Sequence, residues 1–178
     1  MTEALTHLSS EIVDAALMDE ARLMEIAELD LMSTDVDSIL EKAAADAATQ
    51  LGLPIGLVSI VLDEALYFAA MHGVDGWILE ARGHPVEWSF CRFAVATKEA
   101  FVVEDASVHP LMRDNPLVTE MGVRSYAGIP LISSRGNAIG SFCVVGGEPR
   151  SFTDAELMIL RGFAASAMQR IEARRATK

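Results

Sequence analysis

Two apolar segments joined by a short turn constrain the fold of this chain most strongly. The segments "RSYAGIPLI" (residues 124–132) and "AIGSFCVV" (residues 138–145) have the length and composition of β-strands. Between them, "SSRGN" contains Gly136 and Asn137, which suit a tight hairpin because both residue types tolerate positive φ angles. The pattern therefore predicts a pair of antiparallel strands, and the fold has to include an antiparallel sheet.

A helix with complete start signals follows this strand pair. Thr153 and Glu156 have the spacing of a capping box, and Phe152 and Leu157 stand where a hydrophobic staple would be. An apolar stripe then runs along the helix, formed by Leu157, Leu160, Phe163, Ala164, Ala167 and Ile171. An amphipathic helix of this kind needs an apolar surface to cover, and the sheet can provide it.

The first part of the chain predicts helices and a second hairpin. Apolar residues recur at helical spacing over residues 5–27, with an interruption at Asp19, and again over residues 39–51. We predict Asp35 as the N-cap of the second of these helices, which stops at Gly52 shortly before a proline. The segments "IGLVSIVLD" and "LYFAAMHG" then favour two strands joined by a short turn.

The middle of the chain predicts shorter elements. We expect a long connection over residues 73–88, a short helix in "SFCRFAVATKEA", a strand in "FVVEDA", and a two-turn helix capped by Asn115 and ended at Gly122. Strands joined mostly by hairpins predict an α+β fold with a central antiparallel sheet of about six strands. The N- and C-terminal helices would pack on one face, and the short helices and loops would form a pocket on the other.

Charge divides the chain unevenly. Residues 1–46 hold twelve acidic residues against Arg22 and Lys42, which accounts for −10 of the net charge of −12. The last nine residues reverse the sign, with four basic residues against Glu172. We predict an acidic helical extension over residues 1–34 and the main domain, with its C-terminal helix, over residues 35–178. The acidic front and the basic tail either lie against each other, within one chain or between two, or form two separate solvated faces.

Composition and charge exclude several classes of protein. With 51% apolar and 22% charged residues the chain is globular rather than disordered. An acidic chain without a large basic patch suits neither nucleic acid nor an anionic membrane. The chain contains no apolar run of roughly 20 residues and no basic signal-peptide start, so we expect a cytoplasmic protein. Two cysteines are too few for a zinc site, no catalytic triad emerges, and Cys91 and Cys143 are most simply small core residues.

Six short motifs are spaced along the second half of the chain. They are "FC" at 90–91, "VVEDA" at 102–106, "NPLV" at 115–118, "VRSYAGIPL" at 123–131, "IGSFCV" at 139–144 and "PRSFTDAE" at 149–156. Together they resemble the GAF domain family, in the subgroup found in bacterial histidine kinases and diguanylate cyclases. The resemblance covers about residues 35–172 and implies the GAF fold, although Gly146 and Gly147 stand where the subgroup usually has an acidic residue.

The resemblance implies a small-molecule pocket on the distal face of the sheet. The implied ligand-binding residues are Trp88, Phe90, Cys91, Asp105, Asn115, Val118, Met121, Tyr126 and Cys143. Each also has a structural interpretation, because Asp105 suits a turn, Asn115 suits a helix cap, and the aromatic and sulfur-containing side chains suit a filled core.

Three chemistries of the family find little support in these residues. Bilin-binding members carry a cysteine just upstream of an "MGV" segment, but this chain has "NPL" there, which excludes covalent attachment at that position. The Asn-Lys pair of cyclic-nucleotide-binding members is absent, and the nucleophilic "CD" sequence of free methionine sulfoxide reductases has no counterpart. The sequence therefore identifies no cofactor, no metal and no catalytic residue.

We expect a non-catalytic sensory or regulatory domain that binds a small molecule, or responds to redox state, in its distal pocket. It would signal through a helix-mediated homodimer to a partner in trans, since neither end leaves room for an effector domain. The expected dimer contacts are Leu8, Ile12, Leu157, Leu160, Phe163, Ala167 and Ile171. The alternatives are a ligand-free interaction module and, third, a thiol-dependent free methionine sulfoxide reductase.

Overall fold

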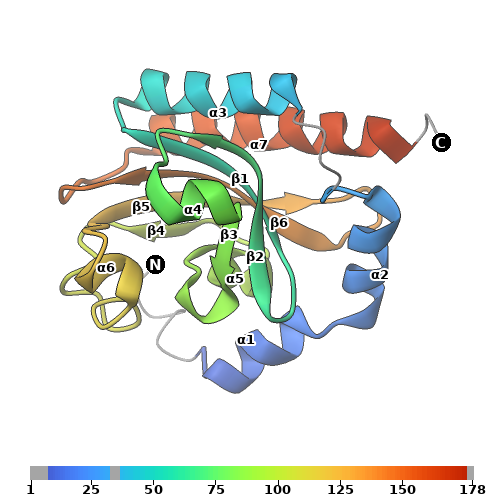
Figure 1. Cartoon of the computed structure of the whole chain (residues 1–178), viewed down its shortest axis with the longest axis horizontal. Helices are drawn as coiled ribbons and strands as arrows, with labels where there is room; N and C mark the ends of the chain where they lie inside the picture. Colours follow the sequence, from blue (N-terminus) through green and yellow to red (C-terminus); the bar gives the residue numbers. More distant parts are fainter. Residues whose placement is uncertain (1–7, 33–36, 176–178) are drawn as a thin grey trace.

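An antiparallel sheet of six strands forms the centre of the structure, a computed structural model that describes residues 8–32 and 37–175 (Figure 1). The strand order is β3-β2-β1-β6-β5-β4, and every pairing is antiparallel. The strands are β1 (Ile55–Val61), β2 (Ala65–His72), β3 (Gly83–Pro85), β4 (Phe101–Val103), β5 (Ser125–Ile132) and β6 (Ala138–Gly146). Both predicted hairpins, β1–β2 and β5–β6, are confirmed, and β1 and β6 pair at the centre of the sheet.

Two long helices cover one face of the sheet. Helices α3 (Ser38–Leu51) and α7 (Asp154–Arg175) lie side by side there, as predicted for the two ends of the domain (Figure 1). Phe142 of β6 is fully buried beneath them and stacks on Phe163 with ring centroids 5.7 Å apart. Gly56 allows α3 to approach closely, because a Cβ there would lie 2.1 Å from the carbonyl oxygen of Ala44. The predicted stripe of α7 therefore packs on the sheet.

Shorter elements cover the other face. They are α1 (Ser10–Leu17), α4 (Gly76–Ala81), the 3-10 helix η1 (Val86–Trp88), α5 (Cys91–Thr97) and α6 (Pro116–Thr119). Helix α1 packs against α5, so this part of the acidic extension lies across the sheet from α7 (Figure 1). Residues 73–88, expected to form a long connection, contain α4, the edge strand β3 and η1. Both α4 and β3 are short, and β3 pairs with β2 over three residues at the edge of the sheet.

The boundaries of the first helices differ in detail from those expected. Asp19 is the N-cap of α2 (Glu20–Leu29) and accepts a hydrogen bond from the backbone N–H of Arg22 at 2.8 Å, so the front segment forms two helices. Asp37 rather than Asp35 caps α3, because its carboxylate accepts from the N–H groups of the second and third helical residues. Asp35 itself lies outside the described residues. Asp37 also binds Arg170 of α7 at 2.9 Å.

Local start and turn signals of the second half are confirmed. Asn115 caps α6 by accepting from the N–H of Leu117 at 2.9 Å. Gly122 and Gly136 have φ angles of 76° and 84°, in the left-handed region predicted for them. At the start of α7, Thr153 N–H donates to Glu156 at 2.9 Å and Glu156 N–H donates to the Thr153 hydroxyl at 3.2 Å. The capping box is therefore complete.

This box predicts a measurable contribution to stability. Replacing Thr153 by alanine removes the acceptor for the Glu156 N–H and is expected to cost about 1 kcal/mol of unfolding free energy. Urea unfolding followed by circular dichroism would measure the cost. Thr119→Ala, a change at the exposed end of the four-residue helix α6, is the matched control. Equal midpoints for wild type and Thr153→Ala would contradict the prediction.

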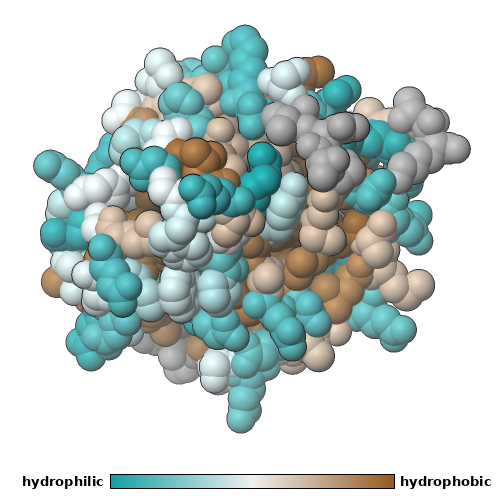
Figure 2. Space-filling model, in the orientation of Figure 1, coloured by the Kyte–Doolittle hydropathy of each residue, from teal (hydrophilic) through white to brown (hydrophobic). Residues whose placement is uncertain are grey.

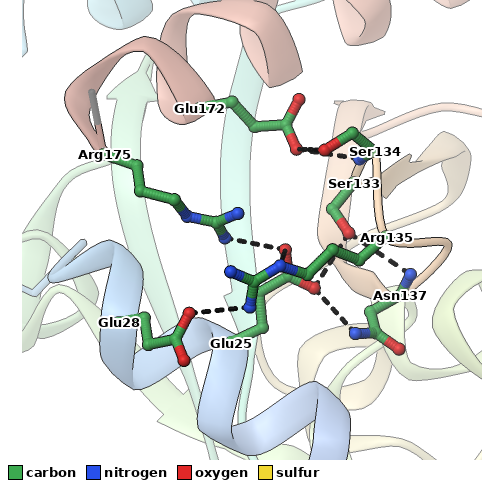
Figure 3. Close-up of polar contacts among 8 residues, drawn as sticks. All are labelled: Glu25, Glu28, Ser133, Ser134, Arg135, Asn137, Glu172 and Arg175. Carbon is green, nitrogen blue, oxygen red and sulfur yellow. Dashed lines mark hydrogen bonds and ion pairs between the residues drawn. The ribbon is translucent and has the colours of Figure 1, made fainter.

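A buried carboxylate joins the front and the end of the chain (Figure 3). Glu25 of α2 is only 1% exposed and accepts hydrogen bonds from Arg175 of α7 at 2.7 Å, from Ser133 at 2.9 Å and from Asn137 at 2.7 Å. Ser133 and Asn137 belong to the turn of the β5–β6 hairpin. We call these four residues the Glu25 clasp. Of the alternatives left open by the sequence, the structure therefore shows the contact between the acidic front and the basic tail within one chain.

Further polar contacts surround the Glu25 clasp (Figure 3). Arg135 binds Glu28 at 2.7 Å, and the backbone N–H and hydroxyl of Ser134 donate to Glu172 at 2.8 and 2.7 Å. Burial opposes ionisation of Glu25, but the hydrogen bonds from Arg175, Asn137 and Ser133 outweigh it, so the pKa of this carboxyl is lowered. The carboxylate is therefore ionised at neutral pH, with its charge met by hydrogen-bond donors.

Hydrophilic and hydrophobic residues are mixed on the surface. On the face drawn in Figure 2, hydrophilic residues predominate, and hydrophobic ones gather between β2 and α2. Three large apolar side chains of this region are exposed, namely Ile12 of α1, Met18 at the C-cap of α1 and Met24 of α2. Within residues 8–32 and 37–175, no helix combines the length and the apolar character needed to cross a bilayer.

Candidate functional site

A cavity of about 170 Å³ lies between the sheet and the short helices α4, α5 and α6. Its apolar wall includes Ile55 and Leu57 of β1, Phe68 of β2, Ile78 of α4 and Val145 of β6. The polar groups that line it are Asp75, His84, Ser89, Cys91, Tyr126 and Cys143. A mostly apolar concavity with a few polar groups is the usual form of a small-molecule site.

Strand alternation explains which side chains reach the cavity. Leu57 of β1 is paired with Cys143 of β6, and both line the cavity. Their neighbours in the strands, Val58 and Phe142, pack instead in the core beneath α3 and α7. Successive side chains of a strand point to opposite faces, so one pair of strands supplies both the cavity wall and the opposite core.

A buried polar network crosses the wall of the cavity. The Tyr126 hydroxyl donates a hydrogen bond to the Cys91 sulfur at 3.2 Å and lies 3.3 Å from the Ser141 hydroxyl. The sulfur atoms of Cys91 and Cys143 are 3.9 Å apart. The Ser59 hydroxyl donates to the Ser141 carbonyl at 3.1 Å. Five polar side chains of an otherwise apolar core are therefore linked by contacts with one another or with the Ser141 backbone.

The contacts within this network shift the pKa values of its members in different directions. The neighbouring Cys143 thiol lowers the pKa of Cys91, against the effect of burial and with help from Ser59, Tyr126 and Ser141. The contact with Cys91, together with burial, raises the pKa of Cys143 well above its ordinary value. Burial likewise raises the pKa of Tyr126, which stays protonated and can donate. If one thiol ionises, it is Cys91.

His84 brings an ionisable ring to the cavity from the edge strand β3. Burial lowers the pKa of this imidazole, although a contact between its Nδ1 and the Pro85 carbonyl oxygen, 2.8 Å away, acts in the opposite direction. Its ring stacks on Trp88 with centroids 6.4 Å apart. The imidazole is therefore largely neutral at pH 7 and contributes polarity rather than charge.

Five of the nine residues predicted to bind a ligand line the cavity. These are Phe90, Cys91, Met121, Tyr126 and Cys143. They come from the start of α5, the segment after α6, and strands β5 and β6. The family motifs therefore located the side of the fold on which the cavity lies.

The other four predicted residues have structural roles away from the cavity lining. Asp105 binds Arg124 at 2.9 Å and accepts from the Ser107 N–H, and these hydrogen bonds hold its pKa well below the ordinary value. Asn115 caps α6 and donates to the Trp88 carbonyl oxygen at 3.0 Å. Val118 is buried in the surrounding core, while the side chain of Trp88 packs edge-on against Trp77.

Sequence reasoning missed several lining residues. Val74, Asp75 and Ile78 lie in or beside α4, and His84 lies in β3. All four fall in the segment expected to be a connection. Leu117 lines the cavity in place of its neighbour Val118. The one available signal was the apolar centre of "DGWILEA" (residues 75–81). This segment is too short to show the apolar periodicity that indicates a helix.

The stripe expected to form a dimer is largely inside the subunit. Leu160, Ala167 and Ile171 are buried between α7 and the sheet, and Leu157 and Phe163 are partly buried there. Leu8 packs partly into the core on the cavity side, whereas Ile12 of α1 is 54% exposed. Burial in the core therefore removes Leu160, Ala167 and Ile171 from the surfaces that another chain can reach.

A family model described as GAF domain matches residues 35–171 of this chain. The chain belongs to the GAF domain family. The match spans all six strands, the cavity and most of α7. The central sheet and flanking helices, with the order of elements observed, form the expected GAF-like α+β fold.

Known proteins resemble this GAF domain in sequence or in three-dimensional structure. This chain is 35% identical over 161 residues to a cyclic di-GMP phosphodiesterase of Pseudomonas aeruginosa. The aligned region covers 89% of this chain but only 27% of that relative. The GAF domain of an Acinetobacter phosphoenolpyruvate-protein phosphotransferase has a similar fold, with a TM-score of 0.66, 18% identity and coverage of 96% and 98% of the two chains. A free methionine-R-sulfoxide reductase of Neisseria meningitidis, solved with its substrate, gives a TM-score of 0.64, 21% identity and coverage of 88% and 90%.

The chemistry available in this GAF domain is limited by its side chains. Within the two described ranges, no cluster of three or more histidine, cysteine or acidic residues is arranged to hold a metal ion. The cavity instead offers an apolar surface, the hydroxyls of Ser89 and Tyr126, two thiols, an imidazole and one carboxylate. These groups suit recognition of a small and mostly apolar molecule.

Proposed function

We propose that this GAF domain is a non-catalytic sensory or regulatory module that binds a small, mostly apolar molecule in the cavity. The observation that carries the proposal is the cavity itself, which lies between the sheet and three short helices, opens to the surface and is lined largely by apolar side chains. The relative from Pseudomonas aeruginosa supports it, because this domain matches only 27% of a longer signalling enzyme. We infer that such a segment regulates rather than catalyses.

The volume of the cavity narrows the class of ligand. At about 170 Å³ it is close to an engineered cavity of about 150 Å³ that binds benzene, and below the roughly 300 Å³ of common drug-sized sites. A tetrapyrrole or a cyclic nucleotide would therefore need the short helices to move apart. A neutral molecule with one or two small rings fits without such a movement.

Isothermal titration calorimetry with indole and toluene as probes tests this proposal. We expect saturable binding of at least one probe to the wild type. Val123 lines the cavity at its partly exposed rim, so Val123→Phe is expected to fill the cavity and weaken binding at least tenfold. Val108→Phe places the same change on a loop residue that is 71% exposed and should bind as the wild type does.

A failure of all probes would support a different function. If neither probe binds and native mass spectrometry finds no retained small molecule, the domain is better explained as a ligand-free interaction module. Equal probe affinity in wild type and Val123→Phe would place binding outside the cavity. Unfolding curves of both variants would confirm that they remain folded.

The proposal also includes a homodimer, formed through helices, that passes the signal to a separate partner protein. Helices α3 and α7 lie across the sheet from the cavity, and β1 and β6 contact both sides. Since the inner stripe of α7 is buried, pairing has to use outward residues such as Met158, which is 67% exposed. Light scattering over a range of concentrations tests this: a mass that stays near 19.2 kDa would exclude the dimer.

A further inference from the structure

Two cysteines from distant parts of the chain meet at the wall of the cavity. Cys91 is the first residue of α5, Cys143 lies in β6, and their sulfur atoms are 3.9 Å apart. Both are buried free thiols. A disulfide bond is about 2.05 Å long, so the pair is reduced and its sulfurs would have to approach by about 2 Å to become linked.

The cavity connects this buried pair with the surface. Both cysteines line it, and so does Met121, which is 44% exposed on the outside of the domain. A space of about 170 Å³ is far larger than the roughly 30 Å³ that one water molecule occupies in the liquid. A small hydroperoxide can therefore reach the sulfurs although the surrounding core is closed.

The surroundings distinguish the two thiols. Cys91 accepts a hydrogen bond from the Tyr126 hydroxyl at 3.2 Å, and the Cys143 sulfur lies 3.9 Å from the Cys91 sulfur. A donor aimed at a sulfur stabilises the thiolate, and the lowered pKa of Cys91 beside the raised pKa of Cys143 agrees with this geometry. Cys91 is therefore the nucleophile, and Cys143 is placed to attack it afterwards.

We propose that Cys91 and Cys143 form a reversible dithiol–disulfide pair that a small hydroperoxide oxidises through the cavity. The pair deepens the proposed sensory function, and it rests on that function only for the biological use of the signal. The chemistry itself rests on the contact between the sulfurs and on their access to the cavity.

The reaction balances in two steps. The Cys91 thiolate attacks one oxygen of hydrogen peroxide, the O–O bond breaks, and the departing hydroxide takes up a proton to leave as water, which yields a sulfenic acid on Cys91. The Cys143 sulfur then attacks the Cys91 sulfur, the S–O bond breaks, and the hydroxide leaves with the Cys143 proton as a second water. Two thiols lose two electrons and two protons, and the peroxide is reduced to two water molecules.

Disulfide formation would alter the cavity. The start of α5 and strand β6 have to move toward each other to close the gap of 3.9 Å. At the same time the Cys91 sulfur, which accepts the hydrogen bond from the Tyr126 hydroxyl, can no longer be a thiolate. The hydrogen bond to it is then lost or weakened. Oxidation therefore reshapes the wall against which a small molecule would bind.

Mass spectrometry of the full chain tests the proposal. We expect the folded wild type, treated with hydrogen peroxide, to lose about two mass units and both alkylatable thiols, and to regain them with dithiothreitol. Peptide mapping should show a link between Cys91 and Cys143 of one chain. If both thiols remain alkylatable at peroxide doses that oxidise a free small-molecule thiol, or if only links between chains appear, the proposal is wrong.

Three variants separate the roles of the residues. In Cys143→Ser a dimedone probe should capture the sulfenic acid on Cys91, whereas Cys91→Ser should leave Cys143 unreacted at the same dose. Tyr126→Phe removes the donor to Cys91 and should slow oxidation by about two- to tenfold while the disulfide still forms. Reaction of Cys143 ahead of Cys91 would overturn the assignment, and circular dichroism would verify that each variant is folded.

The failure of this inference can be distinguished from a failure of the proposed function. Calorimetry with indole uses the reduced protein and no oxidant, while the peroxide experiment uses no ligand. A wild type that forms the disulfide without binding indole or toluene would keep the redox pair and remove the ligand proposal. A wild type that binds a probe but keeps both thiols would do the reverse.

Discussion

Replacing Glu25 by alanine is expected to lower the free energy of unfolding by about 3 kcal/mol. The change leaves the Arg175 guanidinium without its partner and removes the acceptor used by Ser133 and Asn137. Because these groups come from α7 and the β5–β6 hairpin, the loss loosens three segments at once. For a chain of this length we expect the melting temperature to fall by about 6–12 °C.

Glu28→Ala provides the matched control. Glu28 lies one turn further along α2, and its pairing with Arg135 at 2.7 Å is about half exposed to solvent. The same loss of one negative charge should therefore cost less than about 1 kcal/mol. Equal costs for the two substitutions, measured by urea unfolding, would show that the Glu25 clasp contributes no more than an exposed ion pair.

The contribution of Glu25 should also depend on pH. Its carboxyl has a lower pKa in the folded protein than its ordinary value of 4.5, so the unfolded chain binds more protons at mildly acidic pH. The stabilisation is fully present above the ordinary pKa and is lost as pH falls through the folded pKa. The difference in unfolding free energy between wild type and Glu25→Gln should therefore be largest at pH 7 and shrink below about pH 4.

Phe142→Ala is expected to destabilise the domain by about 3–5 kcal/mol. The side chain is fully buried in the central strand β6 and stacks on Phe163 of α7, so truncation leaves a cavity between the sheet and its main covering helix. The midpoint of urea unfolding should fall, with the slope of the transition unchanged.

Met158→Ala is the control for this substitution. Met158 also lies on α7 and is apolar, but it is 67% exposed, so its truncation should change stability by less than about 0.5 kcal/mol. A cost for Phe142→Ala as small as that of Met158→Ala would mean that α7 is not anchored on the sheet as the structure shows.

Elements with strong local signals were predictable from the sequence. The capping box of Thr153 and Glu156, the Asn115 cap and the left-handed glycines at 122 and 136 all occur where their patterns indicate. These features depend on hydrogen bonds and φ angles within a few residues, so the order of residues is enough to determine them. The two hairpins follow for the same reason.

Features that depend on distant residues were not predictable. Helix α4 and strand β3 carry weak local signals and are stabilised by packing and by pairing with β2, which is why their segment looked like a connection. The polar residues predicted for the pocket and those found there differ for the same reason. Asp105 and Asn115 satisfied nearby backbone groups, whereas Asp75 and His84 reached the cavity from a segment without a motif.

The sequence by itself determined that this chain forms antiparallel strands, capped helices and the motifs of a GAF domain, because those properties rest on short-range chemistry. Only the tertiary structure decided that Cys91 meets Cys143 and that Glu25 binds Arg175. In each pair the two residues are separated by many positions, and neither side chain carries a local signal of its partner. The packing of α5 on β6 and of α2 beside α7 brings them together, since burying apolar faces of whole elements sets where their polar side chains end up.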